Sequence, residues 1–188
     1  NINFFNEKAI PKPKQEYSIS KYNAELKLLH KFKTNPTQLT IIRPPMIYGK
    51  VPNGNLKILI LAIKLNLPIP VSKTPNQRSF LGLENLCLFL DNIITKNIKN
   101  NIVYNLSDGT PISTKKLTQT IGQALSKKVR YIVIPDFILK ILVKTPLISN
   151  IFRPFFKNFV IKSLYDEDLQ NKFSLMSTEK LIKKLKFK

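Results

Sequence analysis

A tyrosine and a lysine stand four residues apart in the segment YSISKYNAE, which begins at Tyr17. Residues at positions i and i+4 share one face of a helix, so the phenol of Tyr17 and the ammonium of Lys21 could reach the same small volume. A nearby cation favours the phenolate form of a tyrosine. Such a pair could take a proton from a substrate hydroxyl while a hydride leaves the adjacent carbon. The same spacing also fits a tyrosine at a helix start beside a solvated lysine.

The segments around this pair alternate between helical and extended patterns, which predicts an α/β fold. Residues 17–33 should form a helix, because their apolar side chains fall near one stripe. Pro44 and Pro45 should stop a buried strand over 39–43, since proline cannot donate to a β-ladder. Further helices are expected at 55–65, 84–95, 113–125, 135–144 and 178–185, and further strands or extended pieces at 67–71, 78–81, 103–106 and 130–134.

Two short polar segments should mark the boundaries of these elements. Ser107-Asp108-Gly109 has the composition of a turn and follows the strand expected at 103–106. Ser113 is suited to cap the helix that follows it, because a serine oxygen can accept from the first backbone N–H groups of a helix.

The chain is strongly basic: its 188 residues include 31 Lys plus Arg against 11 Asp plus Glu, a net charge of +20. An acidic partner must therefore be considered. Only four of the cations are arginines, and the lysines are spread along the whole chain. Nucleic-acid binding predicts a clustered basic face with interleaved stacking aromatics or a recognisable module. Neither is found, so a nucleic-acid partner is not expected.

The single cysteine, Cys87, lies in the apolar run Leu86–Leu90, which predicts a buried and unreactive thiol. A disulfide within the chain and a cysteine-rich metal site are both excluded, and no metal is expected. The first sixteen residues contain no sustained apolar stretch, and the run Ile58–Ile63 is far too short to span a membrane. A cytoplasmic location is therefore expected.

Several motifs occur in a fixed order and give the sequence a family resemblance. YSISKYNAE is followed by IIRPPMIYGKVPNGNLKILI, LPIP, QRSFLGLENLCLFL and VYNLSDGTPISTKKLTQTIGQAL. This order resembles the extended short-chain dehydrogenase/reductases, in particular the NAD-dependent epimerase/dehydratase family that acts on nucleotide sugars. The RPPMIYG form is similar to UDP-sugar 4-epimerases of surface-polysaccharide or lipopolysaccharide synthesis. The most specific elements are Tyr17/Lys21, Arg43-Pro44-Pro45, Tyr48-Gly49, Asn55-Leu56 and Arg78.

The resemblance implies a role for each of these motifs. It makes Tyr17 the catalytic base and Lys21 its partner on the nicotinamide ribose of NAD. It implies that the backbone from Pro44 through Pro45 to Met46 lies against the nicotinamide. The implied substrate contacts are Asn55 and Leu56 at the diphosphate and sugar, Pro68 at the uracil platform, and Arg78 at the diphosphate.

Arg78 also has a chemical argument in its favour. A guanidinium can give a phosphate two parallel hydrogen bonds, which a lysine cannot, and this chain uses lysine nearly everywhere else. Simpler interpretations remain open for each motif: Arg78 as a surface charge on a strand edge, Asn55 as a helix cap, and Pro44-Pro45 as a plain strand stop.

The sequence also departs from the family pattern. The family begins with a dinucleotide-binding half whose Gly-rich turn approaches the pyrophosphate. The five glycines of this chain form no Gly-x-Gly or Gly-x-x-Gly pattern. We therefore expect a truncated, C-terminal portion of the enzyme. Residues 1–50 should end a Rossmann-like NAD-binding domain, and residues 51–188 should form mainly the nucleotide-sugar-binding region.

Such a chain is expected to be a poor catalyst alone. Either a separately encoded N-terminal half docks on it, or the sequence is a remnant or a partial sequence. The resemblance implies a homodimer for the intact enzyme and a UDP-sugar as its substrate.

A different class of function is a non-catalytic basic protein that binds an anionic membrane. Its best support is Phe137–Leu164, where cations are interleaved with apolar residues and no acid is present. A substrate-domain helix with solvated lysines fits the same pattern. The cations of this stretch are Lys140, Lys144, Arg153, Lys157 and Lys162.

Overall fold

The computed structural model describes residues 4–52, 54–95, 102–135, 137–138, 156–163 and 175–185. Strands that are far apart in sequence pair side by side in parallel, which is the pattern of an α/β protein. The pairs are β1 (Phe4–Phe5) with β8 (Val160–Ile161), β2 (Thr40–Ile42) with β6 (Ile102–Tyr104), β3 (Met46–Tyr48) with β5 (Phe80–Gly82), and β4 (Ile69–Ser72) with β7 (Tyr131–Ile134).

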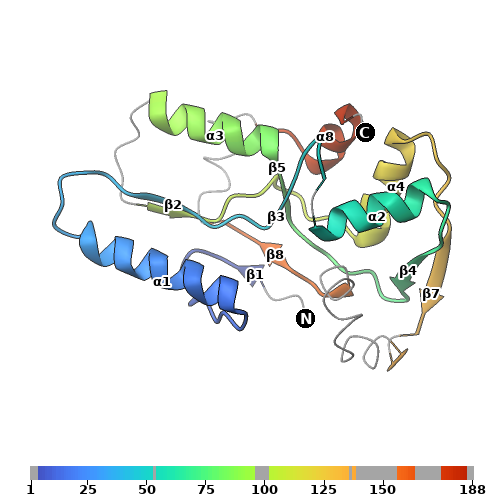
Figure 1. Ribbon diagram of the computed structural model, residues 1–188, viewed down its shortest axis with the longest axis horizontal. Helices are drawn as coiled ribbons and strands as arrows, with labels where there is room; N and C mark the ends of the chain where they lie inside the picture. The colour runs from blue at the N-terminus through green and yellow to red at the C-terminus, as the bar shows by residue number, and fades with distance from the viewer. Residues whose placement is uncertain are drawn as a thin grey trace.

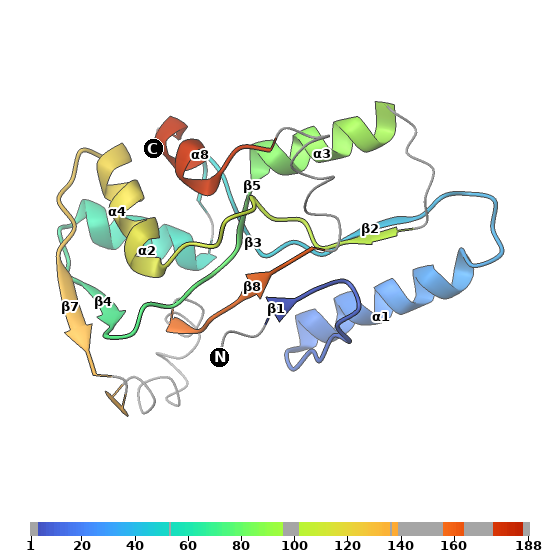
Figure 2. The ribbon, with the colours of Figure 1, turned by 180° about the vertical axis from the view of Figure 1, so that it is seen from behind.

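The helices cover these strand pairs from different sides. Helix α1 (Glu16–Lys31) and helix α3 (Leu83–Thr95) lie on opposite sides of the β2–β6 pair (Figures 1 and 2). Helix α4 (Thr114–Ala124) packs against both α2 (Gly54–Lys64) and α8 (Thr178–Lys184). None of the helices described here has the length and apolar content needed to cross a membrane.

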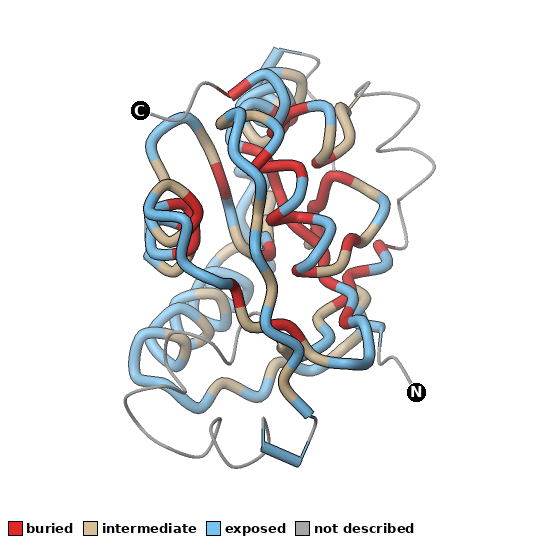
Figure 3. Tube along the Cα trace, turned by 90° about the vertical axis from the view of Figure 1, so that its right-hand side faces the viewer, coloured by how far each residue is buried: buried red, intermediate tan, exposed pale blue. Residues whose placement is uncertain are grey.

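Buried stretches cross the interior of the molecule, with exposed stretches on either side (Figure 3). The larger core cluster lies between α2, α4, α8 and the β3–β5 pair. Helix α2 contributes to it through four apolar side chains at helical spacing, which explains why GNLKILILAIK forms a helix with one buried face. These residues are Leu56, Leu59, Ile60 and Ile63. The smaller cluster consists of Leu81, Phe89, Tyr104 and Leu106.

Most of the elements predicted from the sequence are confirmed. The helices expected at 17–33, 55–65, 84–95, 113–125 and 178–185 are α1, α2, α3, α4 and α8. Ser113 is the cap of α4, and its side chain accepts a hydrogen bond of 3.1 Å from Lys116 N. The predicted strands correspond to β2, β4, β5, β6 and β7, whereas β1, β3 and β8 were not predicted. The helix expected at 135–144 lies almost entirely outside the described residues.

The prediction of a buried Cys87 is wrong, because this side chain is exposed. Helix α3 turns its Asn85 and Phe89 inward, four residues apart, and both are fully buried. Cys87 lies halfway between them in sequence, and this spacing points it away from the buried face. An apolar run that forms a helix is therefore buried on one side only.

The Asp108 carboxylate connects the parts of this fold. Its Oδ1 accepts hydrogen bonds from the backbone N of Gly82 (2.8 Å) and from Asn85 Nδ2 (2.7 Å). Its Oδ2 accepts from the hydroxyl groups of Tyr48 (2.6 Å) and Thr178 (2.9 Å). These donors belong to β5, α3, β3 and α8 respectively. One buried side chain therefore joins two strands and two helices.

Asp108 is buried among its four hydrogen-bond donors, so substitutions at or beside it should disturb the packing. The carboxyl group is 3% exposed, and burial raises its pKa, while its hydrogen bonds to Tyr48, Gly82, Asn85 and Thr178 oppose that rise. A Cβ at Gly82 would lie 2.3 Å from Leu181 Cδ1 and 3.2 Å from the Tyr48 hydroxyl oxygen, so a larger residue here would have to displace the buried Leu181 side chain. Asn85 also holds the backbone of Met176 through two hydrogen bonds of 2.7 and 3.0 Å, which fixes the segment that leads into α8.

We expect Asp108→Ala to lower the free energy of unfolding by about 3 to 5 kcal/mol, because it leaves four donors without their acceptor. Asp108→Asn should cost only about 1 to 2 kcal/mol, since the hydroxyls of Tyr48 and Thr178 can turn and accept from the new amide. Urea unfolding of both variants measures the difference. Equal losses for Ala and Asn would contradict the acceptor role.

Candidate active site

Tyr17 and Lys21 lie on the same face of α1, as their spacing predicted. Lys21 Nζ lies 5.7 Å from the centroid of the Tyr17 ring. Tyr17 is the second residue of α1 and its side chain is 73% exposed. The two side chains are therefore neighbours on one exposed face of α1.

Arg43 anchors the helix that carries this pair. Its guanidinium makes a two-pronged ion pair with Glu25 of α1, with Nη2 to Oε1 at 2.5 Å and Nε to Oε2 at 3.2 Å. Its Nη1 also donates to the backbone oxygen of Glu7 at 3.3 Å. None of the residues of α1 is buried, so this ion pair at the end of β2 is a principal attachment of the helix. The sequence marked Arg43 as part of a motif but did not assign this role.

Pro44, Pro45 and Met46 connect β2 to β3, directly after the arginine that holds α1. Pro44 is exposed, Pro45 is buried, and Met46 is half-buried against the larger core cluster. Strand β3 begins at Met46, so the two prolines separate two short strands rather than simply ending one.

Arg78 is buried, so the interpretation of this residue as a surface charge is wrong. Its residue exposure is 8%, and its backbone is bridged to Ile112 on one side and to Phe159 on the other. Its Nη1 donates to the backbone oxygen of Lys157 at 2.8 Å, and its guanidinium lies 5.6 Å from the centroid of the Phe159 ring.

The guanidinium of Arg78 is only partly satisfied. Its Nε is buried and has no hydrogen-bond partner among the described residues, and within the same residues no carboxylate forms an ion pair with it. Burial lowers the pKa of Arg78 to about 10. A buried cation without a counter-ion is costly, so this arrangement fits a group that is kept for binding an anion.

The other predicted substrate residues have different exposures. Asn55 is half-buried at the start of α2, and Pro68 is exposed just before β4. Leu56 is 3% exposed and belongs to the larger core cluster, so its side chain packs inward.

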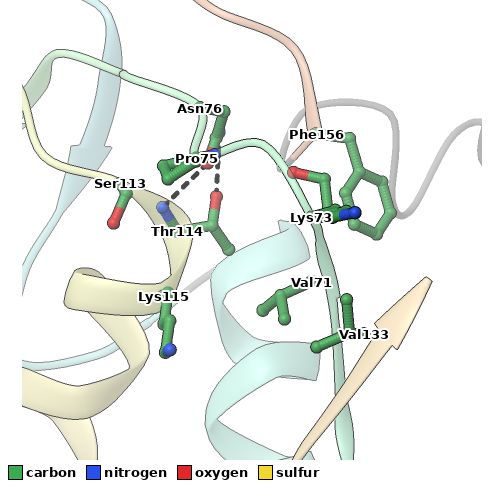
Figure 4. A pocket seen from close by; sticks show the side chains of 10 residues that line it. Val71, Lys73, Pro75, Asn76, Ser113, Thr114, Lys115, Val133 and Phe156 are labelled. Atoms are coloured by element: carbon green, nitrogen blue, oxygen red, sulfur yellow. Dashed lines mark hydrogen bonds between the residues drawn. The ribbon is translucent and has the colours of Figure 1, made fainter. Parts of the chain in front are cut away.

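A pocket of about 270 Å³ lies between the end of β4 and the start of α4 (Figure 4). Its lining includes the lysines Lys73 and Lys115. The lining residue Asn76 stands two positions before Arg78 in the sequence. Asn76 closes one side by donating to Thr114 Oγ1 at 3.1 Å and accepting from Thr114 N at 3.0 Å. No motif in the sequence predicted this pocket. The remaining lining residues are Val71, Ser72, Pro75, Ser113, Val133 and Phe156.

Known proteins resemble this chain in sequence. No protein-family model matches it. UDP-glucose 4-epimerase from Vibrio cholerae is 29% identical over 130 residues, which are 69% of this chain and 40% of that protein. N-acetyl-alpha-D-glucosaminyl-diphospho-ditrans,octacis-undecaprenol 4-epimerase from Escherichia coli O157:H7 is 29% identical over 119 residues, which are 62% of this chain and 36% of that protein. The resemblance to the epimerase/dehydratase family is confirmed.

The epimerase resemblance extends to the fold. The crystal structure of the Bordetella bronchiseptica enzyme WbmG in complex with NAD and UDP aligns with a TM-score of 0.63 at 14% identity, over 94% of this chain and 51% of that one. The Rossmann-like α/β class predicted from the sequence is therefore confirmed. The chain spans about two fifths of the length of the two sequence relatives.

The matches favour the epimerase interpretation over the membrane-binding one. Most of the stretch Phe137–Leu164, on which the membrane interpretation depends, lies outside the described residues. In the part of the chain that is described, no three His, Cys, Asp or Glu side chains converge as metal ligands would.

Inorganic pyrophosphate should bind at Arg78 and stabilise the chain. At 100 times its dissociation constant it should raise the melting temperature by about 5 to 10 °C, and Arg78→Lys should remove most of that increase. Arg130→Lys is the matched control, because it makes the same change at an exposed position. Thermal unfolding with and without pyrophosphate measures the effect. If pyrophosphate raises the melting temperature of Arg78→Lys as much as that of the parent, the anion binds elsewhere, for instance at Lys73 and Lys115.

Proposed function

We propose that this chain is the substrate-binding and proton-transfer portion of an NAD-dependent UDP-sugar 4-epimerase. The observation that carries the proposal is the buried guanidinium of Arg78, whose Nε has no partner among the described residues. The names of both sequence relatives describe 4-epimerases of a sugar that is joined to a diphosphate. A planar guanidinium can bind a phosphate group through two parallel hydrogen bonds, so Arg78 suits a diphosphate.

The substrate would extend in both directions from this arginine. Arg78 binds the diphosphate and gains a counter-ion, which none of the described residues provides. Asn55, at the start of α2, contacts the diphosphate and sugar, with the N–H groups of the helix start favouring the negative charge. Pro68 supports the uracil. Leu56 contributes indirectly, because its burial in the core fixes the start of α2.

Tyr17 would supply the proton transfer. It removes the proton of the sugar hydroxyl and later returns it, first as a base and then as an acid. Lys21 lies over the Tyr17 ring and is the nearest basic side chain of this helix to the tyrosine in sequence. NAD, when bound, would accept the hydride from the sugar carbon and give it back to the opposite face.

The residues present fit only one end of NAD. Tyr17 and Lys21 suit the nicotinamide ribose, and the backbone from Pro44 to Met46 suits the nicotinamide. The turn that would hold the pyrophosphate of NAD needs closely spaced glycines, and this sequence has none in that pattern. The apolar side chains of Ile19, Leu26 and Leu29 on α1 are exposed in this chain.

UDP should bind the chain more tightly than inorganic pyrophosphate does, because the nucleoside adds contacts to those of the diphosphate. Arg78→Lys should weaken UDP binding by about 10-fold or more, which corresponds to losing one charged hydrogen bond. Titration calorimetry on the parent chain, Arg78→Lys and the Arg130→Lys control gives these affinities. Equal affinities for UDP and pyrophosphate would show that no nucleoside is recognised.

In an active enzyme that contains this chain, Tyr17→Phe should reduce kcat by about 10² to 10⁴, because the variant keeps the ring but loses the acid/base group. The affinity for UDP should remain within about twofold, since diphosphate binding depends on Arg78. Tyr22→Phe on the same helix is the matched control. If Tyr17→Phe interconverts UDP-sugars at the parent rate, Tyr17 is not the base.

A further inference from the structure

Arg78 contacts one short segment, residues 157–159, which lies about eighty residues later in the sequence. Phe159 brackets the arginine through its backbone, since Phe159 N donates to Gln77 O at 2.9 Å and Ser79 N donates to Phe159 O at 2.8 Å. Lys157, two residues earlier, supplies the carbonyl that accepts from Arg78 Nη1 at 2.8 Å. The backbone on both sides of Arg78 is therefore fixed by Phe159.

The aromatic ring of Phe159 contacts the guanidinium of Arg78. Its centroid lies 5.6 Å from Arg78 Cζ, within the range of a cation–π contact. The guanidinium thus has one hydrogen bond to a carbonyl and one ring contact that limit its rotation, while its Nε has no partner in the described part of the chain. A partly desolvated cation gains more from such a ring than an exposed one does.

Phe159 also contacts β1, the strand that precedes α1 in the sequence. Its ring stacks on Phe5 with a centroid distance of 5.3 Å and an interplanar angle of 29°. Phe5 belongs to β1, which pairs in parallel with β8, and Lys162 N donates to Phe5 O at 3.0 Å. Strand β1 is followed in sequence by α1, which carries Tyr17.

We propose that Phe159 is a positioning residue for Arg78: its ring, together with the Lys157 carbonyl, holds the guanidinium in one orientation, and its stack on Phe5 ties that guanidinium to the strand before α1. The identity of the anion as a nucleoside diphosphate rests on the proposed function. The positioning of the guanidinium does not, because it follows from the contacts of Arg78, Phe159 and Phe5 alone.

The test compares Phe159→Leu, which removes the ring, with Phe159→Tyr, which keeps it. Phe4→Leu is the matched control, because it makes the same change in β1 at a ring that is 59% exposed. In ¹⁵N spectra of the chain the Nε–Hε signal of Arg78 is identified by its loss in Arg78→Lys. The chain has only four arginines, so this region of the spectrum is simple.

We expect Phe159→Leu to shift the Arg78 Nε–Hε signal toward that of an exposed arginine and to weaken UDP binding by about 3- to 30-fold, the range of one cation–π contact. Phe159→Tyr and Phe4→Leu should leave both the signal and the affinity within about twofold of the parent. An unmoved signal in Phe159→Leu overturns the proposal, and so does a moved signal with unchanged UDP affinity.

A failure of the proposed function gives a different result. If the parent chain does not bind UDP, the nucleotide assignment fails. The Arg78 signal alone then decides the positioning role: a shift in Phe159→Leu that is absent in Phe159→Tyr supports it, and no shift overturns it.

Discussion

The Asp108 carboxylate accepts hydrogen bonds from four donors that belong to β3, β5, α3 and α8. Strands β3 and β5 have three residues each and α8 has seven, so these elements depend on contacts with the rest of the fold. Because all four meet at one buried acceptor, a shift of any element would leave a buried donor unsatisfied. Strand β5 begins two residues after Arg78, so the position of that arginine depends on the same carboxylate.

Asp108 and Arg78 are both buried ionisable groups, but their surroundings are opposite. Asp108 accepts two hydrogen bonds on each oxygen, whereas Arg78 has a buried Nε without a partner among the described residues. Burial of a satisfied acid stabilises a unique arrangement of the elements around it. Burial of an unsatisfied cation costs stability, and this cost supports our proposal that Arg78 binds an anion. The two groups therefore differ in how far the fold itself satisfies them.

The sequence predicted the parts of this fold that depend on local patterns. Helices α1, α2 and α4 have apolar stripes or a Ser cap within their own residues, and the i, i+4 spacing correctly put Tyr17 and Lys21 on one face. Strand β3 was missed because three residues after two prolines carry too little periodicity to identify a strand.

The remaining features depend on contacts between distant residues. Strands β1 and β8 are two residues each and pair across most of the chain. Asp108 was identified only as a turn residue, since its donors come from positions 48, 82, 85 and 178. Arg78 was identified from the family resemblance, with its chemistry in support, but its burial and its contact with Phe159 could not be read from the local sequence.

A crystal structure of the chain with bound UDP tests the central claim most directly, which is that Arg78 is a diphosphate-binding residue. We predict a diphosphate oxygen within about 3 Å of a guanidinium nitrogen of Arg78, with the uracil beside Pro68. UDP bound between Lys73 and Lys115, without any contact to Arg78, would contradict it.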